Sequence, residues 1–437
     1  MSDFLIDPVT SPFTATVTPP GSKSLTNRAL VLAALADGVT TLSNVLFADD
    51  TLVMLKDLGR LGFRLEIDRA ANSVRVHGQR GQINCDSADL QCGNRGSTIR
   101  FLTALCTLGR GRFTLDGVTR MRQRPIRELV DKLRNLGARA NYLAADGFPP
   151  VEILADGLAG GIMRFGAAAS SQYLSAIFMV APYVRNELSV DLESGQTSWP
   201  YVAMTMRIMD EFGVICELIK DRNTGEPRRI VVPQGVYTAR EYAIEPDASN
   251  ASYFLALAAI HKGSKVTIAG LGRKSLQGDV GFADVLKQMG ADVTVSSDSI
   301  TVAGTGEFEG IDTDLSAMPD TAQTLAVAAL FAKGSTTIRG LKTLRVKETD
   351  RLAALSNELT KLGAEVDIEG DALSIHPPEK FRPAAIDTYD DHRMAMSFSL
   401  AATKVSGVTI KNAECVGKTY PNYFEDLRKV LEVNSKF

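Results

Sequence analysis

The chain has 437 residues, of which 45% are hydrophobic and 23% are charged, and its formal net charge is −3. This length exceeds one ordinary hydrophobic core and predicts at least two domains, and the composition is typical of a soluble globular protein. The near-neutral charge excludes a broad basic surface for nucleic acid or for an anionic membrane, so any bound anion must be met by a local cluster of cations.

The N-terminal residues and the cysteine spacing indicate in which cellular compartment the protein is found. Residues 1–20 show no basic leader followed by an apolar run, and no uncharged apolar run in the chain approaches the roughly 20 residues of a membrane span. The five cysteines are odd in number and lack CxxC spacing, which fits reduced thiols better than a disulfide framework. We therefore expect a cytoplasmic protein without nucleic-acid or membrane partners.

One pattern recurs along the chain at intervals of 73 to 77 residues. An amphipathic helical stretch ends in an apolar residue, a glycine follows, and an extended stretch comes next. The marker glycines are Gly62, Gly137, Gly213, Gly290 and Gly363. Glycine is expected there as a helix C-cap, because it enters the left-handed region without steric cost.

Each repeat predicts a helix of small apolar residues, a strand and then an amphipathic helix. The first helices are expected at 28–38, 99–109, 173–183, 252–263, 324–334 and 393–403. The strands that follow are expected at 39–45, 112–118, 186–192, 264–271, 335–341 and 406–412. The second helices are expected at 52–61, 126–136, 202–212, 282–289, 351–362 and 423–431. This alternation indicates an α/β fold.

Six repeats divide naturally into two lobes of three. We expect an N-terminal lobe at 21–245 and a C-terminal lobe at 246–437, with residues 1–20 forming a strand that could join either lobe and is assigned here to the C-terminal one. A two-lobed enzyme commonly binds its ligand between the lobes.

Basic side chains stand near the predicted starts of many helices, where the helix dipole favours acids. In PGSKSLTNRAL, for example, Lys23 and Arg28 flank such a start. A cation in a first turn costs up to roughly 1 kcal/mol, so folding alone explains such residues poorly. The set comprises Lys23, Arg28, Arg100, Arg124, Lys347, Arg351, Arg393 and Lys418. Either these are scattered solvated charges, or an anionic ligand lies beyond the helix ends, where Gly96 would let the backbone approach it.

Acid–base groups lie among these cations. Asp320 has no adjacent Lys or Arg and could take a proton from a substrate hydroxyl, or could be a simple N-cap. Glu348 lies between Lys347 and Arg351 and could form only a structural ion pair. Asp391 and His392 are further candidates, although His392 could equally be an interior histidine.

Motifs for other chemistries are missing from the sequence. It contains no GxxxxGK[ST], GxGxxG or GxSxG motif, and its four histidines have no metal-ligand spacing. We therefore expect group transfer between small polyanions without a cofactor and without a metal.

The sequence resembles the EPSP synthase family of enolpyruvyltransferases over nearly its full length. The resemblance rests on PGSKSLTNRAL, GNRGSTIRFL, RQRPI, ASSQY, SWPY, EPDASNASYF, QGDVGFADVL, MPDTAQTLAV, RVKETDRL, YDDHRMAM and GKTYPNYF. It implies two similar domains, each of three βαβαββ units in an inside-out α/β barrel, with helix N-termini facing the interdomain cleft. It also implies transfer of the enolpyruvyl group of phosphoenolpyruvate to the 5-hydroxyl of shikimate 3-phosphate, releasing phosphate, on the shikimate pathway to chorismate and the aromatic amino acids.

The resemblance also assigns roles to residues. Phosphoenolpyruvate would be bound by Lys23, Asn94, Gly96, Arg100, Arg124, Gln172, Arg351, Arg393 and Lys418. Shikimate 3-phosphate would be bound by Lys23, Ser24, Arg28, Ser170, Ser171, Gln172, Ser198, Asp320, Thr343 and Lys347. The catalytic groups would be Asp320 as the base for the attacking hydroxyl and Glu348, with Lys23, for the proton on the methylene carbon.

Three positions depart from the family's pattern. Arg95 replaces a small residue before Gly96, Phe101 stands where plant-type members carry Pro, and Thr343 replaces an Asn. The retained Gly96 implies that glyphosate competes with phosphoenolpyruvate.

Two alternative functions remain open at this point. One is enolpyruvyl transfer to a UDP-amino sugar, although Met121–Pro125 lacks the reactive Cys of that sister family. The other is a non-catalytic polyanion-binding protein. We expect a monomer, because the two lobes of one chain would themselves form the cleft.

Overall fold

The computed structural model describes residues 3–166, 170–194 and 198–432. The chain forms two compact units: an N-terminal unit, Gly21–Ile244, and a C-terminal unit made of Met1–Pro20 and Glu245–Phe437. Within the described residues, no helix combines the length and the apolar character needed to cross a membrane.

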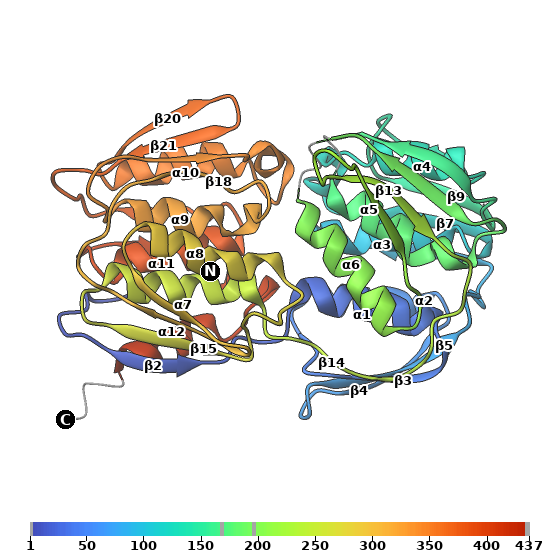
Figure 1. The fold of residues 1–437 in the computed structure, drawn as a ribbon, viewed down its shortest axis with the longest axis horizontal. Coiled ribbons are helices and arrows are strands. Elements are labelled where there is room, and N and C mark those ends of the chain that lie inside the picture. The colour runs from blue at the N-terminus through green and yellow to red at the C-terminus, as the bar shows by residue number, and fades with distance from the viewer. Residues whose placement is uncertain (1–2, 167–169, 195–197, 433–437) are drawn as a thin grey trace. The chain divides into compact units, whose positions relative to one another are not determined.

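Three buried helices form the centre of the N-terminal unit (Figure 1). They are α1 (Lys23–Leu35), α3 (Gly96–Cys106) and α5 (Ser171–Val180), and they contact one another. Every residue of α3 is buried, as is every residue of α1 from Leu25 onward. A helix that is apolar on all sides is stable only inside a core, which explains the small apolar residues of these segments. Three more helices accompany them: α2 (Asp49–Arg60), α4 (Arg127–Asn135) and α6 (Trp199–Glu211).

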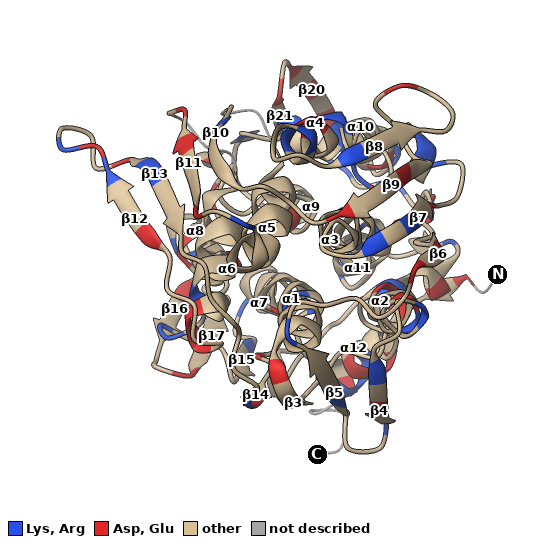
Figure 2. Ribbon diagram, turned by 90° about the vertical axis from the view of Figure 1, so that its right-hand side faces the viewer, with Lys and Arg blue, Asp and Glu red and all other residues tan. Residues whose placement is uncertain are grey.

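Three four-stranded sheets surround these central helices. Their strand orders are β14-β3-β5-β4, β6-β7-β9-β8 and β10-β11-β13-β12. The bounds are β3 (Asp37–Ser43), β4 (Arg64–Asp68), β5 (Ser73–Gln79), β6 (Ser87–Gln91), β7 (Arg110–Asp116), β8 (Arg139–Tyr142), β9 (Val151–Asp156), β10 (Gly161–Phe165), β11 (Leu188–Leu192), β12 (Glu217–Lys220), β13 (Pro227–Val232) and β14 (Glu241–Ala243). Each sheet begins with a parallel pair and continues antiparallel. Figure 2 shows charged residues along these outer strands, whereas α1, α3 and α5 are almost free of them.

The C-terminal unit repeats this plan. Its buried central helices are α7 (Ala248–Ile260), α9 (Ala322–Ala329) and α11 (His392–Ala402), and its outer helices are α8 (Phe282–Gln288), α10 (Arg351–Lys361) and α12 (Tyr423–Glu432). Its sheets have the orders β16-β17-β15-β2, β18-β19-β21-β20 and β1-β23-β22. The bounds are β1 (Phe4–Leu5), β2 (Thr14–Val17), β15 (Lys265–Ala269), β16 (Asp292–Val295), β17 (Ser299–Ala303), β18 (Asp312–Asp314), β19 (Thr336–Arg339), β20 (Glu365–Glu369), β21 (Ala372–His376), β22 (Ala385–Ile386) and β23 (Thr409–Ile410).

The repeats differ in which segment of the chain supplies their first strand. Three of them read βαβαββ without interruption, for example β6-α3-β7-α4-β8-β9. The first repeat instead takes its leading strand from β14, which pairs in parallel with β3, and the fourth takes it from β2, which pairs in parallel with β15. The N-terminal strand therefore belongs to the C-terminal unit. The prediction of an α/β fold with three repeats in each of two similar units, helices inside and sheets outside, is confirmed.

The marker glycines have the predicted conformation. Their φ angles are 87°, 98°, 89°, 102° and 104° in chain order, all in the left-handed region. Gly290 has a second constraint, because a Cβ there would collide with the carbonyl oxygen of Glu307. Gly334 offers a contrast in the same unit, since its φ is 82° but a Cβ would meet no atom within 4 Å.

These two glycines give a matched test of the repeat junction. Gly334→Ala is expected to lower the free energy of unfolding by about 1–2 kcal/mol, the cost of a left-handed L-residue. Gly290→Ala adds overpacking against a backbone carbonyl, and its total cost is expected to be about 2–5 kcal/mol. Urea denaturation of both variants measures the difference, and equal losses would contradict the packing argument.

Candidate active site

Arg28 is a buried cation in the N-terminal unit that is surrounded by neutral groups. Its side chain lies in α1, and Nε donates to Thr205 Oγ1 at 2.7 Å while Nη2 donates to Ser175 Oγ at 3.1 Å. Further bonds go to the carbonyl oxygens of Ser24 from Nη1 and of Tyr201 from Nη2. The guanidinium carbon lies 5.2 Å from the ring centroid of Phe101.

This environment leaves the positive charge of Arg28 unbalanced. Among the described residues, none of its hydrogen-bond partners is a carboxylate, and burial lowers its pKa to about 10. Buried charges are normally paired, because desolvation is otherwise costly. A guanidinium has five N–H groups, and these four bonds leave one of them, at Nη1, available. An anion that reaches Nη1 could supply the missing charge.

A second cationic group lies at the start of α3. A Cβ on Gly96 would collide with Arg124 Nη2 and would lie 2.6 Å from Arg100 Nη1, so only glycine allows both guanidiniums to approach the helix here. Arg124 Nη1 donates to the carbonyl oxygen and to Oδ1 of Asn94, at 3.2 and 3.1 Å. The helix N-terminus adds its own partial positive charge.

Gln172 links α3 to α5. Arg100 Nη1 donates to Gln172 Oε1 at 2.6 Å, and Gln172 Nε2 donates to Ser97 Oγ at 3.2 Å. The predicted residues Asn94, Gly96, Arg100, Arg124 and Gln172 are thus brought together in one unit. Two guanidiniums at a helix N-terminus form a site suited to a phosphate or a carboxylate.

Residues that sequence reasoning missed hold the RQRPI loop. The hydroxyl of Tyr173 donates to the carbonyl oxygen of Pro125 at 2.6 Å, and the Tyr173 ring lies 5.3 Å from the Arg100 guanidinium. Arg122 donates two hydrogen bonds to the Asp116 carboxylate, at 2.9 and 2.5 Å. Tyr173 is 48 positions from Pro125 and 73 from Arg100 in sequence, so no local pattern could have identified these two contacts.

The predicted serines stand at helix starts. Ser22 caps α1 by accepting from the Leu25 amide, which places Lys23 and Ser24 in the first turn. Ser170 Oγ accepts from the Gln172 amide and so caps α5, and Ser171 is the first residue of that helix. Ser198 precedes α6 with a left-handed φ of 57°. Ala169, which opens the ASSQY motif, lies outside the described residues.

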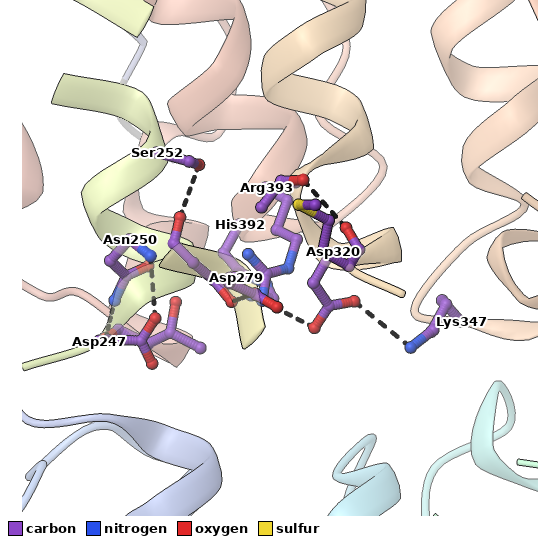
Figure 3. Close-up of polar contacts among 12 residues, drawn as sticks. Asp247, Asn250, Ser252, Asp279, Asp320, Lys347, His392 and Arg393 are labelled. Atoms are coloured by element: carbon purple, nitrogen blue, oxygen red, sulfur yellow. Dashed lines mark hydrogen bonds and ion pairs between the residues drawn. The ribbon is translucent and has the colours of Figure 1, made fainter. Parts of the chain in front are cut away.

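Asp320 is the centre of a cationic cluster in the C-terminal unit. It lies in a short 3-10 helix, Pro319–Thr321, directly before α9. Arg393 Nη2 donates to Oδ2 at 2.9 Å, and Lys347 Nζ and Arg351 Nη1 approach Oδ1 at 3.3 and 3.4 Å. Figure 3 shows Asp320 between Lys347 and Arg393, which come from different segments of the chain.

Arg351 joins Asp320 to two further carboxylates. Its Nε lies 2.7 Å from Asp391 Oδ2, and its Nη2 lies 3.0 Å from Glu348 Oε2. Burial alone would lower the pKa of Arg351, but the carboxylates of Asp391, Glu348 and Asp320 outweigh burial and raise it. Lys418 Nζ donates to the other oxygen of Glu348 at 2.8 Å. The four cations and three carboxylates of this group sum to a formal charge of +1.

Polar groups from other elements lie beside this cluster (Figure 3). His392 is buried, with Nδ1 3.4 Å from Asp391 Oδ1. Asp247 caps α7 by accepting from the Asn250 amide at 2.8 Å, and Asn250 Nδ2 donates to the carbonyl oxygen of Thr419 at 3.3 Å. Thr343 lies in the turn before Lys347, and its buried Oγ1 has no hydrogen-bond partner within the described part of the chain.

The prediction that the cations occupy the first turns of helices is wrong for most of them. Lys23, Arg351 and Arg393 do lie in the first turns of α1, α10 and α11. Arg28 and Arg100 lie a turn deeper, because their helices already begin at Lys23 and Gly96. The remaining three precede a helix: Arg124, Lys347 and Lys418. Tertiary contacts, rather than the dipole argument, explain these five positions.

Known proteins share this architecture and sequence. The profile of the family described as EPSP synthase (3-phosphoshikimate 1-carboxyvinyltransferase) matches residues 9–427. The chain is 46% identical to a 3-phosphoshikimate 1-carboxyvinyltransferase of Sulfurovum sp. (strain NBC37-1), over 94% of this chain and 95% of the relative. It is 45% identical to a protein of the same name from Shewanella piezotolerans, over 97% and 98%.

A solved structure agrees with these relatives. The EPSP synthase of Acinetobacter baumannii matches with a TM-score of 0.81 at 26% identity and covers 98% of each chain. The buried cations, the six repeats and the extent of these matches lead to one conclusion: the chain belongs to the EPSP synthase family.

Proposed function

We propose that the protein transfers the enolpyruvyl group of phosphoenolpyruvate to the 5-hydroxyl of shikimate 3-phosphate. The hydroxyl oxygen forms a bond to C2 of phosphoenolpyruvate while C3 gains a proton, giving a tetrahedral intermediate. Loss of phosphate from C2 and of a proton from C3 then yields 5-enolpyruvylshikimate 3-phosphate. The observation that carries this proposal is the buried guanidinium of Arg28 with neutral partners, which calls for an anionic substrate. The match to named relatives over nearly the whole chain supports the same reaction.

Shikimate 3-phosphate is assigned to residues around the starts of α1, α5 and α6 and to the Asp320 side of the cationic cluster. Arg28 would donate from its available N–H to an anionic group of this substrate. Thr343 supports the assignment, because its buried hydroxyl lacks a hydrogen-bond partner among the described residues. The full set is Lys23, Ser24, Arg28, Ser170, Ser171, Gln172, Ser198, Asp320, Thr343 and Lys347.

Phosphoenolpyruvate is assigned to the remaining cations. The paired guanidiniums of Arg100 and Arg124 against Gly96 suit a phosphate or a carboxylate. The full set is Lys23, Asn94, Gly96, Arg100, Arg124, Gln172, Arg351, Arg393 and Lys418. These preorganised donors would also stabilise the charge of the departing phosphate, which lets the reaction run on protein groups without a cofactor.

Two carboxylates supply the acid–base chemistry. Asp320 would accept the proton of the 5-hydroxyl, and its three cationic neighbours keep it oriented. Glu348, with Lys23, would move the proton at C3. The contacts of Glu348 to Lys418 and Arg351 would hold its carboxylate in place during this transfer.

We assign the protein to the cytoplasm and expect it to act as a monomer. None of its five cysteines forms a disulfide, which suits a reducing compartment. Every residue given a role belongs to this one chain, so no second copy is needed to supply a catalytic or binding group.

The first test replaces Arg28 with an apolar residue of similar length. Arg28→Met is expected to raise the KM for shikimate 3-phosphate about 10- to 100-fold, since a hydrogen bond to a charged group is worth about 1.5–3 kcal/mol. Stability without substrate should be unchanged or higher, because an unbalanced buried charge is removed. Arg164→Met, at an exposed position of β10, is the matched control and should leave KM unchanged. A large loss of stability with an unchanged KM would overturn the assignment.

The second test concerns the proposed base. Asp320→Asn keeps the shape of the side chain but removes proton acceptance, so kcat should fall about 10²- to 10⁴-fold while both substrates still bind. Phosphate release measures kcat, and calorimetry measures binding. Asp312→Asn changes an exposed aspartate of the same unit that pairs with Arg339, and it should retain wild-type turnover. A near-wild-type kcat for Asp320→Asn would exclude Asp320 as the base.

A further inference from the structure

The loop before α11 contains two strained residues next to the candidate site. Tyr389 and Asp390 have φ angles of 55° and 53°, in the left-handed region that L-residues rarely adopt. Asp is tolerated there more readily than Tyr, and each such residue costs about 1–2 kcal/mol. Strain of this kind persists only where surrounding contacts impose it.

Asp391 directly follows the strained pair. The Asp391 carboxylate accepts from Arg351 Nε at 2.7 Å, and its Oδ1 also accepts from the Arg393 amide at 3.0 Å as the cap of α11. Two of the proposed phosphoenolpyruvate-binding cations therefore depend on one carboxylate at the end of this loop.

Glu358 holds the other end of the loop. Its carboxylate is fully buried, and Oε1 accepts from the Tyr389 hydroxyl at 2.7 Å while Oε2 accepts from the Asp387 amide at 3.0 Å. Lys361 Nζ donates to both oxygens of Glu358 and to Asp387 Oδ2. Lys411 Nζ donates to Asp387 Oδ1 at 3.0 Å.

Helix α10 supplies both supports of the loop. Glu358 follows Arg351 by seven residues, or about two helical turns, which places both side chains on one face about 10 Å apart. Glu358 contacts Asp387 and Tyr389, and Arg351 contacts Asp391. If Glu358 served only to pair with Lys361, it would have no reason to accept hydrogen bonds from the Asp387 amide and the Tyr389 hydroxyl as well.

We propose that Glu358 is a positioning residue for phosphoenolpyruvate binding. By holding Tyr389 and Asp390 in their left-handed conformation, it keeps Asp391 where that carboxylate orients Arg351 and the start of α11 that carries Arg393. Glu358 itself contacts no substrate. This inference rests on the proposed function, because it assigns Arg351 and Arg393 to phosphoenolpyruvate.

The experiment compares three variants of the full-length protein. Tyr389→Phe removes only the hydroxyl that donates to Glu358, Glu358→Gln weakens both the loop contacts and the pair with Lys361, and Glu369→Gln is the control at an exposed glutamate of β20. We expect the KM for phosphoenolpyruvate to rise about 3- to 10-fold in Tyr389→Phe and about 10-fold or more in Glu358→Gln. The KM for shikimate 3-phosphate and both constants of Glu369→Gln should not change.

These constants separate positioning from a merely structural role. Loss of folded protein alone would lower kcat and leave both KM values at the wild-type level. An unchanged KM for phosphoenolpyruvate in Tyr389→Phe would overturn the proposal, even if Glu358→Gln fails to fold.

Amide hydrogen exchange keeps this test independent of activity. In Tyr389→Phe we expect faster exchange at residues 387–393 and unchanged exchange in α1. If wild-type protein releases no phosphate from the two substrates, the proposed function fails, and this exchange result alone decides whether Glu358 positions the loop. Unchanged exchange at 387–393 would overturn the positioning role.

Discussion

The charge of buried cations is the constraint on which the site depends. Arg28 is held by hydroxyl and carbonyl oxygens, whereas Arg351 is held by three carboxylates. The charge of Arg351 is therefore balanced within the protein before any ligand binds, whereas the charge of Arg28 is not. Both side chains are fully buried, so each guanidinium loses its hydration. Ion pairs offset this desolvation cost for Arg351, whereas only neutral hydrogen bonds offset it for Arg28.

The repeated fold explains why these groups gather. Each unit buries three helices of mostly small apolar residues, so polar side chains are accommodated most easily near the ends of these helices. Polar residues gather at the starts of α1, α3, α5, α7, α9 and α11: a Ser at α1 and α5 and an Asp at α7 and α11 cap the helix. The start of a helix also presents backbone N–H groups without a partner inside the helix, from which an anion can accept hydrogen bonds.

Much of this could be read from the sequence, because periodicity and glycine placement are local signals. The intervals of Gly62 through Gly363 predicted the repeats, and RVKETDRL and YDDHRMAM predicted a mixed group of cations and carboxylates, which the fold brings together through Arg351 and Asp391. The turn that each cation occupies could not be read in this way, as Arg28 and Arg100 show. Nor could the contacts of Tyr173 with Pro125 or of Glu358 with Tyr389, because they join segments that only the tertiary fold brings together.

A crystal structure with shikimate 3-phosphate bound would show whether Arg28 binds an anionic group of this substrate. We expect the available Nη1–H of Arg28 to donate to such a group while its bonds to Ser175 and Thr205 persist. A complex in which Arg28 keeps only its neutral protein partners, and the anionic groups of the ligand contact other cations alone, would contradict it.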